Sequence, residues 1–141
     1  MRYMMIVKAD ANYEAGLPPP PALMDAIDRH SQEMAQQGIL LEAGGLLPSS
    51  AGARVRVTGG RLTVLDGPFA ETKELIAGYW LWQVRDMDEA IEWAKRCPNP
   101  TGAESVLELR PVFEAEDFGD NLTPELREQE ERLRSEIQER S

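Results

Sequence analysis

The chain has 141 residues, 42% of them hydrophobic, and a formal net charge of −10 at pH 7. This length fits one globular domain with a core of useful size, and the negative charge argues against nucleic acid or an anionic membrane surface as a partner. No run approaches the roughly 20 apolar residues of a membrane helix, and the first residues lack the apolar core of a signal peptide. The single Cys97 cannot form an internal disulfide, so we expect a cytoplasmic protein.

The first third of the chain predicts a strand, a helix and a second strand. Residues 2–8, "RYMMIVK", are apolar at nearly every position, which indicates a strand covered on both faces. A proline-rich loop, "ANYEAGLPPPP", leads into a helix over residues 22–37, which Gly38 is suited to end. A strand with a bend or bulge at Gly44 and Gly45 follows in "ILLEAGGLLP". The expected core-facing residues of the helix are Met24, Ile27, Ser31 and Met34.

The stretch "ARVRVTGGRLTVLDG" predicts a β-hairpin. Polar and apolar residues alternate in it on both sides of Gly59-Gly60, and this glycine pair supplies the turn. The arginines and Thr63 are expected to face water, so this ribbon should be half exposed.

The next part repeats the strand–helix–strand order. Residues 78–84, "GYWLWQV", carry bulky side chains on both faces of a predicted strand. Asp86 is suited to cap a helix that Pro98 stops, and Glu89 completes a capping-box spacing. Residues 105–113 predict the last core strand. The expected buried residues of the helix are Met87, Ala90, Ile91 and Ala94.

The end of the chain differs from the rest in charge. Residues 114–141 hold ten acidic residues and four arginines, whereas the remaining chain is only mildly acidic. A helix is expected over residues 122–140, with Thr123 as N-cap and Pro124 as its first residue. We therefore predict a domain over residues 1–116 and an acidic helical tail over 117–141. The apolar stripe of the tail consists of Leu122, Leu126, Leu133 and Ile137.

Together these elements predict a ferredoxin-like α+β domain. The order is βαβ, an added hairpin, and a second βαβ, which is the split βαβ arrangement. Two helices can cover one face of such a sheet, yet the strands at residues 3–7 and 79–84 are apolar on both sides. Because an exposed apolar face of that size usually marks an interface, we expect a homodimer whose sheets meet face to face.

The connection "DGPFAETKE" is longer than a hairpin turn requires, since two residues can make such a turn. Pro68 fixes its own φ and restricts Gly67, so the turn is rigid. Asp66 has two interpretations: a turn former that accepts hydrogen bonds from nearby amides, or a carboxylate held at a pocket. Phe69 is either a core plug or a platform for a substrate. A fixed loop of this kind suits binding.

The stretch "LDGPFAETKELIAGYWLW" resembles the motif of YCII-related proteins of the DGPF type, named after Asp66-Gly67-Pro68-Phe69. The similarity extends to "RYMMIVK", His30, "GGLLP", "DMDEAIEWA" and "ELRPV", and so covers nearly the whole chain. The resemblance implies a dimeric α/β-barrel built from ferredoxin-like protomers, with a pocket in each. It also implies that Thr72 and Lys73 hold the loop and line the mouth of the pocket.

The resemblance does not fix a reaction. Members of this family include proteins encoded beside extracytoplasmic-function sigma factors, and a related branch includes a dehydrochlorinase of aromatic degradation. For the superfamily a His–Asp pair is the proposed catalytic element. The corresponding residues here are His30 and Asp66.

His30 is the only histidine, and its spacing from Ile27 and Met34 places it on or beside the buried stripe of the first long helix. Histidine can act as an acid or a base near neutral pH; the alternative is a hydrogen-bonded histidine at a helix–sheet boundary. The predicted site therefore has His30 and Asp66 as catalytic residues, with Phe69, Thr72 and Lys73 around them. One histidine and one cysteine give no metal-ligand spacing, and no phosphate-binding glycine motif occurs, so we expect neither a metal nor a cofactor.

Three classes of function stay open at this point. The first is a cofactor-free enzyme that uses His30 and Asp66 for proton transfer on an unknown small molecule. The second is a metabolite-binding or regulatory module linked to sigma-factor signalling, without turnover. The third is an interaction protein whose acidic tail engages a partner. His30 and the ordered loop favour a pocket over a pure scaffold, but ferredoxin-like folds host many activities.

Overall fold

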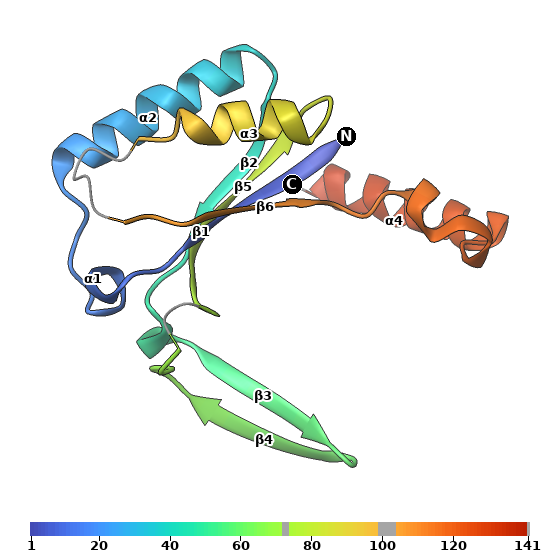
Figure 1. Ribbon diagram of the computed structural model, residues 1–141. Coiled ribbons are helices and arrows are strands. Elements are labelled where there is room, and N and C mark those ends of the chain that lie inside the picture. Colours follow the sequence, from blue (N-terminus) through green and yellow to red (C-terminus); the bar gives the residue numbers. More distant parts are fainter. Residues whose placement is uncertain (72–73, 99–103, 141) are drawn as a thin grey trace. The chain divides into compact units, whose positions relative to one another are not determined.

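The computed structural model describes residues 1–71, 74–98 and 104–140 (Figure 1). The chain forms two compact units, Met1–Pro111 and Val112–Ser141. In the first unit the elements follow the order β1 (Arg2–Lys8), α1 (Ala11–Glu14), α2 (Pro21–Gln36), β2 (Leu40–Gly45), η1 (Ser49–Ala51), β3 (Ala53–Thr58), β4 (Arg61–Asp66), β5 (Ile76–Gln83), α3 (Met87–Lys95) and β6 (Leu107–Pro111).

The main sheet confirms the predicted ferredoxin-like fold. Its four strands lie in the order β2-β5-β1-β6, and each neighbouring pair is antiparallel. The two central strands, β1 and β5, are those whose sequences are apolar on both faces. Helices α2 and α3 lie together over one face of this sheet (Figure 1). The hairpin β3–β4 is inserted between β2 and β5 as a separate two-stranded sheet.

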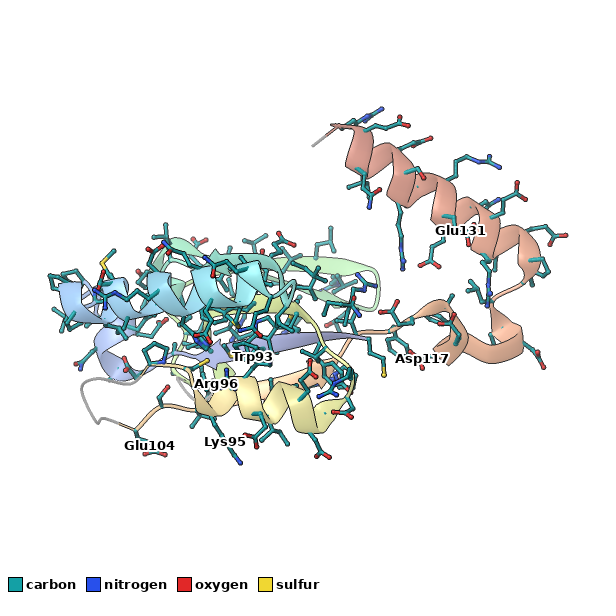
Figure 2. All side chains as sticks on the ribbon, turned by 90° about the horizontal axis from the view of Figure 1, so that it is seen from above. Trp93, Lys95, Arg96, Glu104, Asp117 and Glu131 are labelled. Carbon is teal, nitrogen blue, oxygen red and sulfur yellow. The ribbon has the colours of Figure 1, made fainter. Side chains whose placement is uncertain are left out.

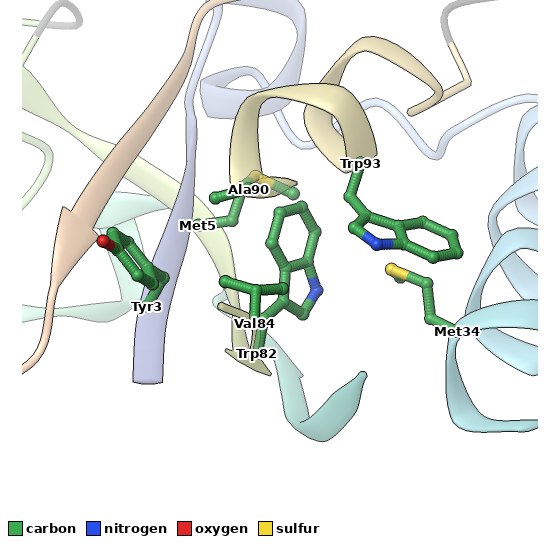
Figure 3. Packing of buried hydrophobic residues seen from close by; sticks show 7 residues of the cluster. All are labelled: Tyr3, Met5, Met34, Trp82, Val84, Ala90 and Trp93. Atoms are coloured by element: carbon green, nitrogen blue, oxygen red, sulfur yellow. The ribbon is translucent and has the colours of Figure 1, made fainter. Parts of the chain in front are cut away.

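The core lies between the helices and the sheet. Met5 of β1 pairs with Trp80 of β5, and Tyr3 pairs with Trp82, so these side chains share the helix-covered face. Figure 3 shows Trp82 at the centre of this layer, with Trp93 of α3 and Met34 of α2 beside it. The fully buried side chains of greatest volume are Trp82, Met5 and Met34.

The opposite face of the sheet carries the alternate residues of the same strands. Met4 pairs with Leu81, and Ile6 pairs with Tyr79. Charged side chains flank this apolar centre, including Lys8, which forms an ion pair of 3.7 Å with Glu108. This face is the one on which the homodimer was predicted.

The two core helices bury a different stripe from the one expected. On α2 the buried residues are His30 and Met34, whereas Met24 is 58% exposed and Ile27 lies at the surface. The prediction for Met24 and Ile27 was therefore wrong. The helix begins at Pro21 and is rotated so that His30 takes a core position. Gly38, with φ of +74°, follows the helix end as expected.

Helix α3 confirms its predicted cap and corrects its predicted face. Asp86 accepts a hydrogen bond of 2.9 Å from the Glu89 backbone N–H. Ala90 and Trp93 are buried, whereas Ile91 is exposed, because the face that meets the sheet includes Trp93. Figure 2 shows Trp93 directed toward α2 and Lys95 directed away from it.

The bulge in strand β2 lies earlier in the chain than predicted. The register against β5 shifts between Leu40 and Glu42, so the extra residue is Leu41 and not the glycine pair. Gly44 has another role: a Cβ at this position would lie 2.9 Å from the Tyr79 ring. A larger residue would push this ring away from the strand.

The second unit contains η3 (Ala115–Asn121) and α4 (Pro124–Arg140). Thr123 Oγ1 accepts a hydrogen bond of 3.2 Å from the Leu126 backbone N–H, which confirms the predicted N-cap. Phe113 and Phe118 stack with their ring centroids 5.0 Å apart. No described residue of α4 is buried, and Leu126, Leu133 and Ile137 are each about half exposed.

Candidate functional site

His30 occupies a buried aromatic position. Its side chain is only 6% exposed. The Trp80 ring lies 5.6 Å from the imidazole on one side, and the Trp93 ring lies 6.0 Å from it on another. Trp80 comes from β5 and Trp93 from α3, so three elements meet at this histidine. The prediction of a sheet-facing histidine on the first long helix is confirmed.

Burial lowers the pKa of His30 below its usual value of 6.5. The Glu33 carboxylate and a hydrogen bond to the Trp93 backbone oppose this effect, while the Arg96 guanidinium adds to it. The imidazole is therefore mostly neutral at pH 7. A neutral imidazole has one nitrogen that can accept a proton, which is the state that a general base requires.

Cys97 lies directly beside the histidine. Its Sγ is 3.7 Å from His30 Nε2 and 3.9 Å from the Trp93 carbonyl oxygen. Burial raises the pKa of the Cys97 thiol to about 11. Because the thiol keeps its proton and the imidazole stays neutral, this contact is not a thiolate–imidazolium ion pair. The sequence alone had indicated only that Cys97 cannot form an internal disulfide.

A second polar atom is buried in the same aromatic layer. Trp82 Nε1 has no hydrogen-bond partner among the residues that the structure describes. Its indole nitrogen points to the side where Met34 and Trp93 lie (Figure 3). Leaving a buried donor unpaired costs about 1–3 kcal/mol, so such donors are rare in purely structural cores.

Asp66 lies elsewhere in the first unit. It is the last residue of β4, pairs with Ala53 across the hairpin, and is exposed. Within residues 1–71, 74–98 and 104–140, no hydrogen bond or ion pair joins it to His30, and no amide donates to its carboxylate. A single chain therefore does not bring the two predicted catalytic residues into direct contact.

The DGPF turn is tightly held against η1. A Cβ on Gly67 would lie 1.7 Å from the Ser49 carbonyl oxygen, so only glycine fits there. The Phe69 backbone N–H donates a 3.0 Å hydrogen bond to Ser49 Oγ. The Gly67–Pro68 peptide bond is cis.

Glu14 completes this support. Its Oε1 accepts a 3.0 Å hydrogen bond from the Ser49 backbone N–H, and its Oε2 accepts a short one from the Ser49 hydroxyl. Tyr13, beside it on α1, donates from its hydroxyl to the Ala77 carbonyl oxygen of β5 at 3.0 Å. Helix α1 thus links the DGPF turn to the main sheet.

Phe69 has an unexpected neighbour. The Arg54 guanidinium lies 3.9 Å above the centroid of its ring, and Phe69 is half-buried outside the main core cluster. It is therefore not a plug of that core. Thr72 and Lys73, the other predicted loop residues of the site, lie outside the described residues.

Sequence reasoning missed Glu14, Ser49 and Cys97. Cys97 follows Trp93 by four positions, and this spacing is typical of two residues on the same side of a helical turn. The spacing was therefore a signal that Cys97 and Trp93 face the same neighbour. Glu14 and Ser49 lie 35 positions apart, in stretches without periodicity. No local pattern connects them.

The residues of this site fall inside a recognised family domain. The YCII-related domain matches residues 1–116 of the chain. The chain belongs to the YCII-related family. An uncharacterized protein of Rhizobium meliloti (strain 1021) is 35% identical over 89 residues, which is 63% of this chain and 69% of that protein. Both the DGPF turn and the His30 cluster belong to the YCII-related domain.

Across the described ranges, no three residues among His, Cys, Asp and Glu are grouped so that they could hold a metal ion. None of the described helices has the length and apolar character needed to cross a membrane.

Proposed function

We propose that this chain is a cytoplasmic, homodimeric pocket protein that binds a small molecule next to His30 and transfers a proton to or from it without a cofactor. The observation that carries the proposal is the state of His30. It is the only histidine in the sequence and lies buried between Trp80 and Trp93. Its lowered pKa leaves a neutral imidazole at pH 7, which can take a proton from a bound substrate.

The Trp82 indole N–H, which lacks a hydrogen-bond partner among the described residues, supports a polar ligand in the same layer. A ligand oxygen that accepted this hydrogen bond would remove the cost of the buried donor. The surrounding tryptophans favour a flat or aromatic molecule, because stacked aromatic rings attract one another. Entry of such a molecule requires side chains over His30 to move aside.

Asp66 has a separate place in the proposal. The DGPF turn holds it on a rigid backbone, which suits a carboxylate that orients a substrate or, from a second copy, the imidazole. The His30–Asp66 pair therefore stays a hypothesis. Single and double variants can test whether the two residues act together. If Asp66 acts through His30, the double variant should be no worse than either single variant.

The alternative function is a metabolite-binding or regulatory module linked to sigma-factor signalling. It uses the same pocket and needs no turnover. The contact between the Cys97 thiol and His30 Nε2 favours this alternative. A general base is more effective when the lone pair of its ring nitrogen is free for the substrate, and here the thiol lies against that nitrogen. The two functions differ in whether a bound molecule leaves chemically changed.

The test begins with native mass spectrometry of the purified protein, which identifies any small molecule that is retained. Its binding and conversion are then measured with His30→Gln and Asp66→Asn, two variants that keep the shape of each side chain. We expect His30→Gln to abolish conversion and to weaken binding less. If both variants bind and convert the molecule as the parent chain does, with folding intact, the proposed site is wrong.

The homodimer has its own test. Leu81 lies on the uncovered face of the central strand β5, opposite Met4. Leu81→Asp would place an unpaired charge in the proposed interface, at a cost of several kcal/mol. Ala22→Asp is the matched control, since Ala22 is exposed on α2, which covers the other face of the sheet. Light scattering should show a dimer for the parent and the control and a monomer or unfolded chain for Leu81→Asp; a monomeric parent at micromolar concentration contradicts the proposal.

A further inference from the structure

The carboxyl-terminal end of α3 meets one nitrogen of the His30 ring. Cys97 Sγ lies 3.7 Å from His30 Nε2 and 3.9 Å from the Trp93 carbonyl oxygen, one helical turn earlier in the chain. These groups therefore gather at one edge of a side chain that is only 6% exposed. The protons on them decide which ring nitrogen can act as a base.

The protons at this contact can be counted. The Cys97 thiol keeps its single proton, because burial raises the pKa of this thiol to about 11. The Trp93 carbonyl oxygen has no proton and can only accept a hydrogen bond, and the thiol donates to it at 3.9 Å. The Cys97 sulfur is then left with lone pairs to offer to Nε2. A neutral imidazole has one N–H, so this arrangement requires the proton on Nε2.

The reverse arrangement is less favourable. If the thiol donated to Nε2, the ring proton would lie on Nδ1. Within residues 1–71, 74–98 and 104–140, no hydrogen bond of His30 Nδ1 is found, and a buried N–H without an acceptor is destabilising. A hydrogen bond to the Trp93 backbone also raises the pKa of His30, as expected when a ring N–H donates to a carbonyl oxygen.

We propose that the end of α3 holds His30 as the Nε2–H tautomer, so that Nδ1 carries the lone pair and accepts the proton of the bound molecule. Cys97 Sγ and the Trp93 carbonyl oxygen are positioning groups, which act through the imidazole. The two ring nitrogens point in different directions, so the molecule presents its proton on the side of the ring away from Cys97. The role of Nδ1 rests on the proposed function, whereas the tautomer does not.

This tautomer changes what the Cys97 contact means for the choice between enzyme and binding module. The contact favours a binding module only when the thiol covers the lone pair of the base. In the Nε2–H tautomer the thiol lies against the N–H, and the lone pair is on the other nitrogen. The hydrogen bond that one ring nitrogen makes fixes the state of the other. The end of α3 then prepares the base.

The tautomer also limits the role of Asp66. This residue ends the β3–β4 ribbon, which is exposed on both faces, whereas the sequence predicted a half-exposed ribbon. A carboxylate that orients a neutral imidazole must accept its N–H. The end of α3 already accepts that N–H, so a carboxylate from a second copy would meet only the lone pair of Nδ1. Asp66 is left to orient the substrate.

The experiment uses the full chain labelled with 15N-histidine and needs no ligand. His30 is the only histidine, so the spectrum contains one imidazole. We record two-bond 1H–15N correlations at about pH 8, where a histidine is neutral. We expect the 15N shift of a protonated nitrogen at Nε2 and of an unprotonated nitrogen at Nδ1. In the urea-denatured chain the two shifts should approach each other, because the tautomers exchange. A proton on Nδ1, or folded shifts equal to the denatured ones, overturns the proposal.

Two variants test the positioning role of Cys97 through the pKa of His30, measured from the same signals. Cys97→Val removes the acceptor and admits no water, so we expect a further lowered pKa, because an acceptor of N–H favours the charged ring. Cys97→Ser restores an acceptor and should restore the pKa. The charged groups that act on His30, Glu33 and Arg96, are the same in both variants. A raised pKa in Cys97→Val would mean that the thiol donates to Nε2 and would contradict the proposal.

Asp66→Asn separates this inference from a carboxylate that holds the ring. We expect both imidazole 15N shifts to be unchanged in this variant, and a shift that moves toward the denatured values contradicts the assignment to α3. Failure of the proposed function gives a different result. If Nε2 carries the proton but His30→Gln still converts the bound molecule, the proposed function is wrong and the tautomer stands. If Nδ1 carries the proton, the tautomer is wrong, and catalysis by His30 is judged by its own test.

Discussion

Cys97 Sγ lies 3.7 Å from His30 Nε2, and burial keeps both groups uncharged. Cysteine–histidine pairs that act as nucleophiles depend on a thiolate, which a neighbouring positive charge stabilises. Here the thiol has a pKa of about 11, and the imidazole has a lowered pKa. The pair therefore resembles a hydrogen-bonded core contact. The proton-accepting atom in this layer is the imidazole nitrogen.

Cys97 should react slowly with alkylating reagents. At pH 8 a thiol of pKa about 11 is roughly 0.1% ionised, whereas an ordinary cysteine is roughly a quarter ionised. We expect the reaction with iodoacetamide to be at least about 100-fold slower in the folded chain than in the denatured chain, and to accelerate up to pH 10. A plateau of the rate near pH 7 would mean that His30 does activate the thiol.

His30 should make stability depend on pH. The unfolded histidine titrates near 6.5, while the folded one titrates lower. Between these two pKa values the unfolded chain binds more protons, so the free energy of unfolding falls as the pH drops below 6.5 and is fully retained above it. His30→Gln should flatten this part of the curve in urea melts at a series of pH values. A parent curve that stays parallel to that of His30→Gln from pH 7 to pH 5 contradicts a buried neutral histidine.

The fold was predictable because its signals are local. The glycine turn of the hairpin, the Asp86 cap and the doubly apolar strands each depend on neighbouring residues, and together they give one topology. Which face of α2 would be buried was less predictable. Met24 and His30 lie on different sides of the helix, and hydrophobicity alone favours burial of the methionine. His30 is buried instead, because Trp80 and Trp93 pack beside it.

The site was predictable only in part, because its parts belong to distant segments. The position of His30 followed from helix periodicity. Its neighbour Cys97 lies 67 positions away, and the Glu14–Ser49 contact that supports the DGPF turn depends on how α1 and η1 meet in space. Such contacts arise from tertiary packing, which spacing along one segment does not encode.

Gly67→Ala should disrupt the DGPF turn. The added methyl group would lie 1.7 Å from the Ser49 carbonyl oxygen, which is backbone and cannot swing away. We expect a loss of stability of about 1–3 kcal/mol, as for other overpacked sites. Gly45→Ala is the matched control, because a Cβ there meets nothing within 4 Å. Chemical denaturation measures both variants, and equal stabilities would show that the turn can move away from Ser49.

Glu14→Gln should loosen the same turn without overpacking it. The glutamate accepts two hydrogen bonds from Ser49, and hydrogen bonds to charged groups contribute about 1.5–3 kcal/mol each. An amide keeps the shape but offers only one acceptor oxygen. Asp25→Asn is the control, since it also removes one negative charge but affects only an exposed ion pair with Arg29, which contributes little. We expect faster hydrogen exchange of the Phe69 amide in Glu14→Gln alone.

Deletion of residues 119–141 should leave a folded core. The family domain ends at residue 116, and the first compact unit ends at residue 111. No described residue of α4 is buried, and its apolar stripe is narrow, so little packing energy is lost with it. Removing the helix also removes net negative charge, which reduces self-repulsion.

We expect the truncated chain to keep the near-ultraviolet circular dichroism of its tryptophans and to melt only a few degrees lower than the full chain. Its oligomeric state should be unchanged, because the proposed dimer contact uses β1 and β5. The control replaces Leu126 and Leu133 by Ser in the full chain, which removes the apolar stripe but keeps the charge of the tail. If both changes abolish the tryptophan signal, α4 packs on the core, and the boundary placed near residue 117 is wrong.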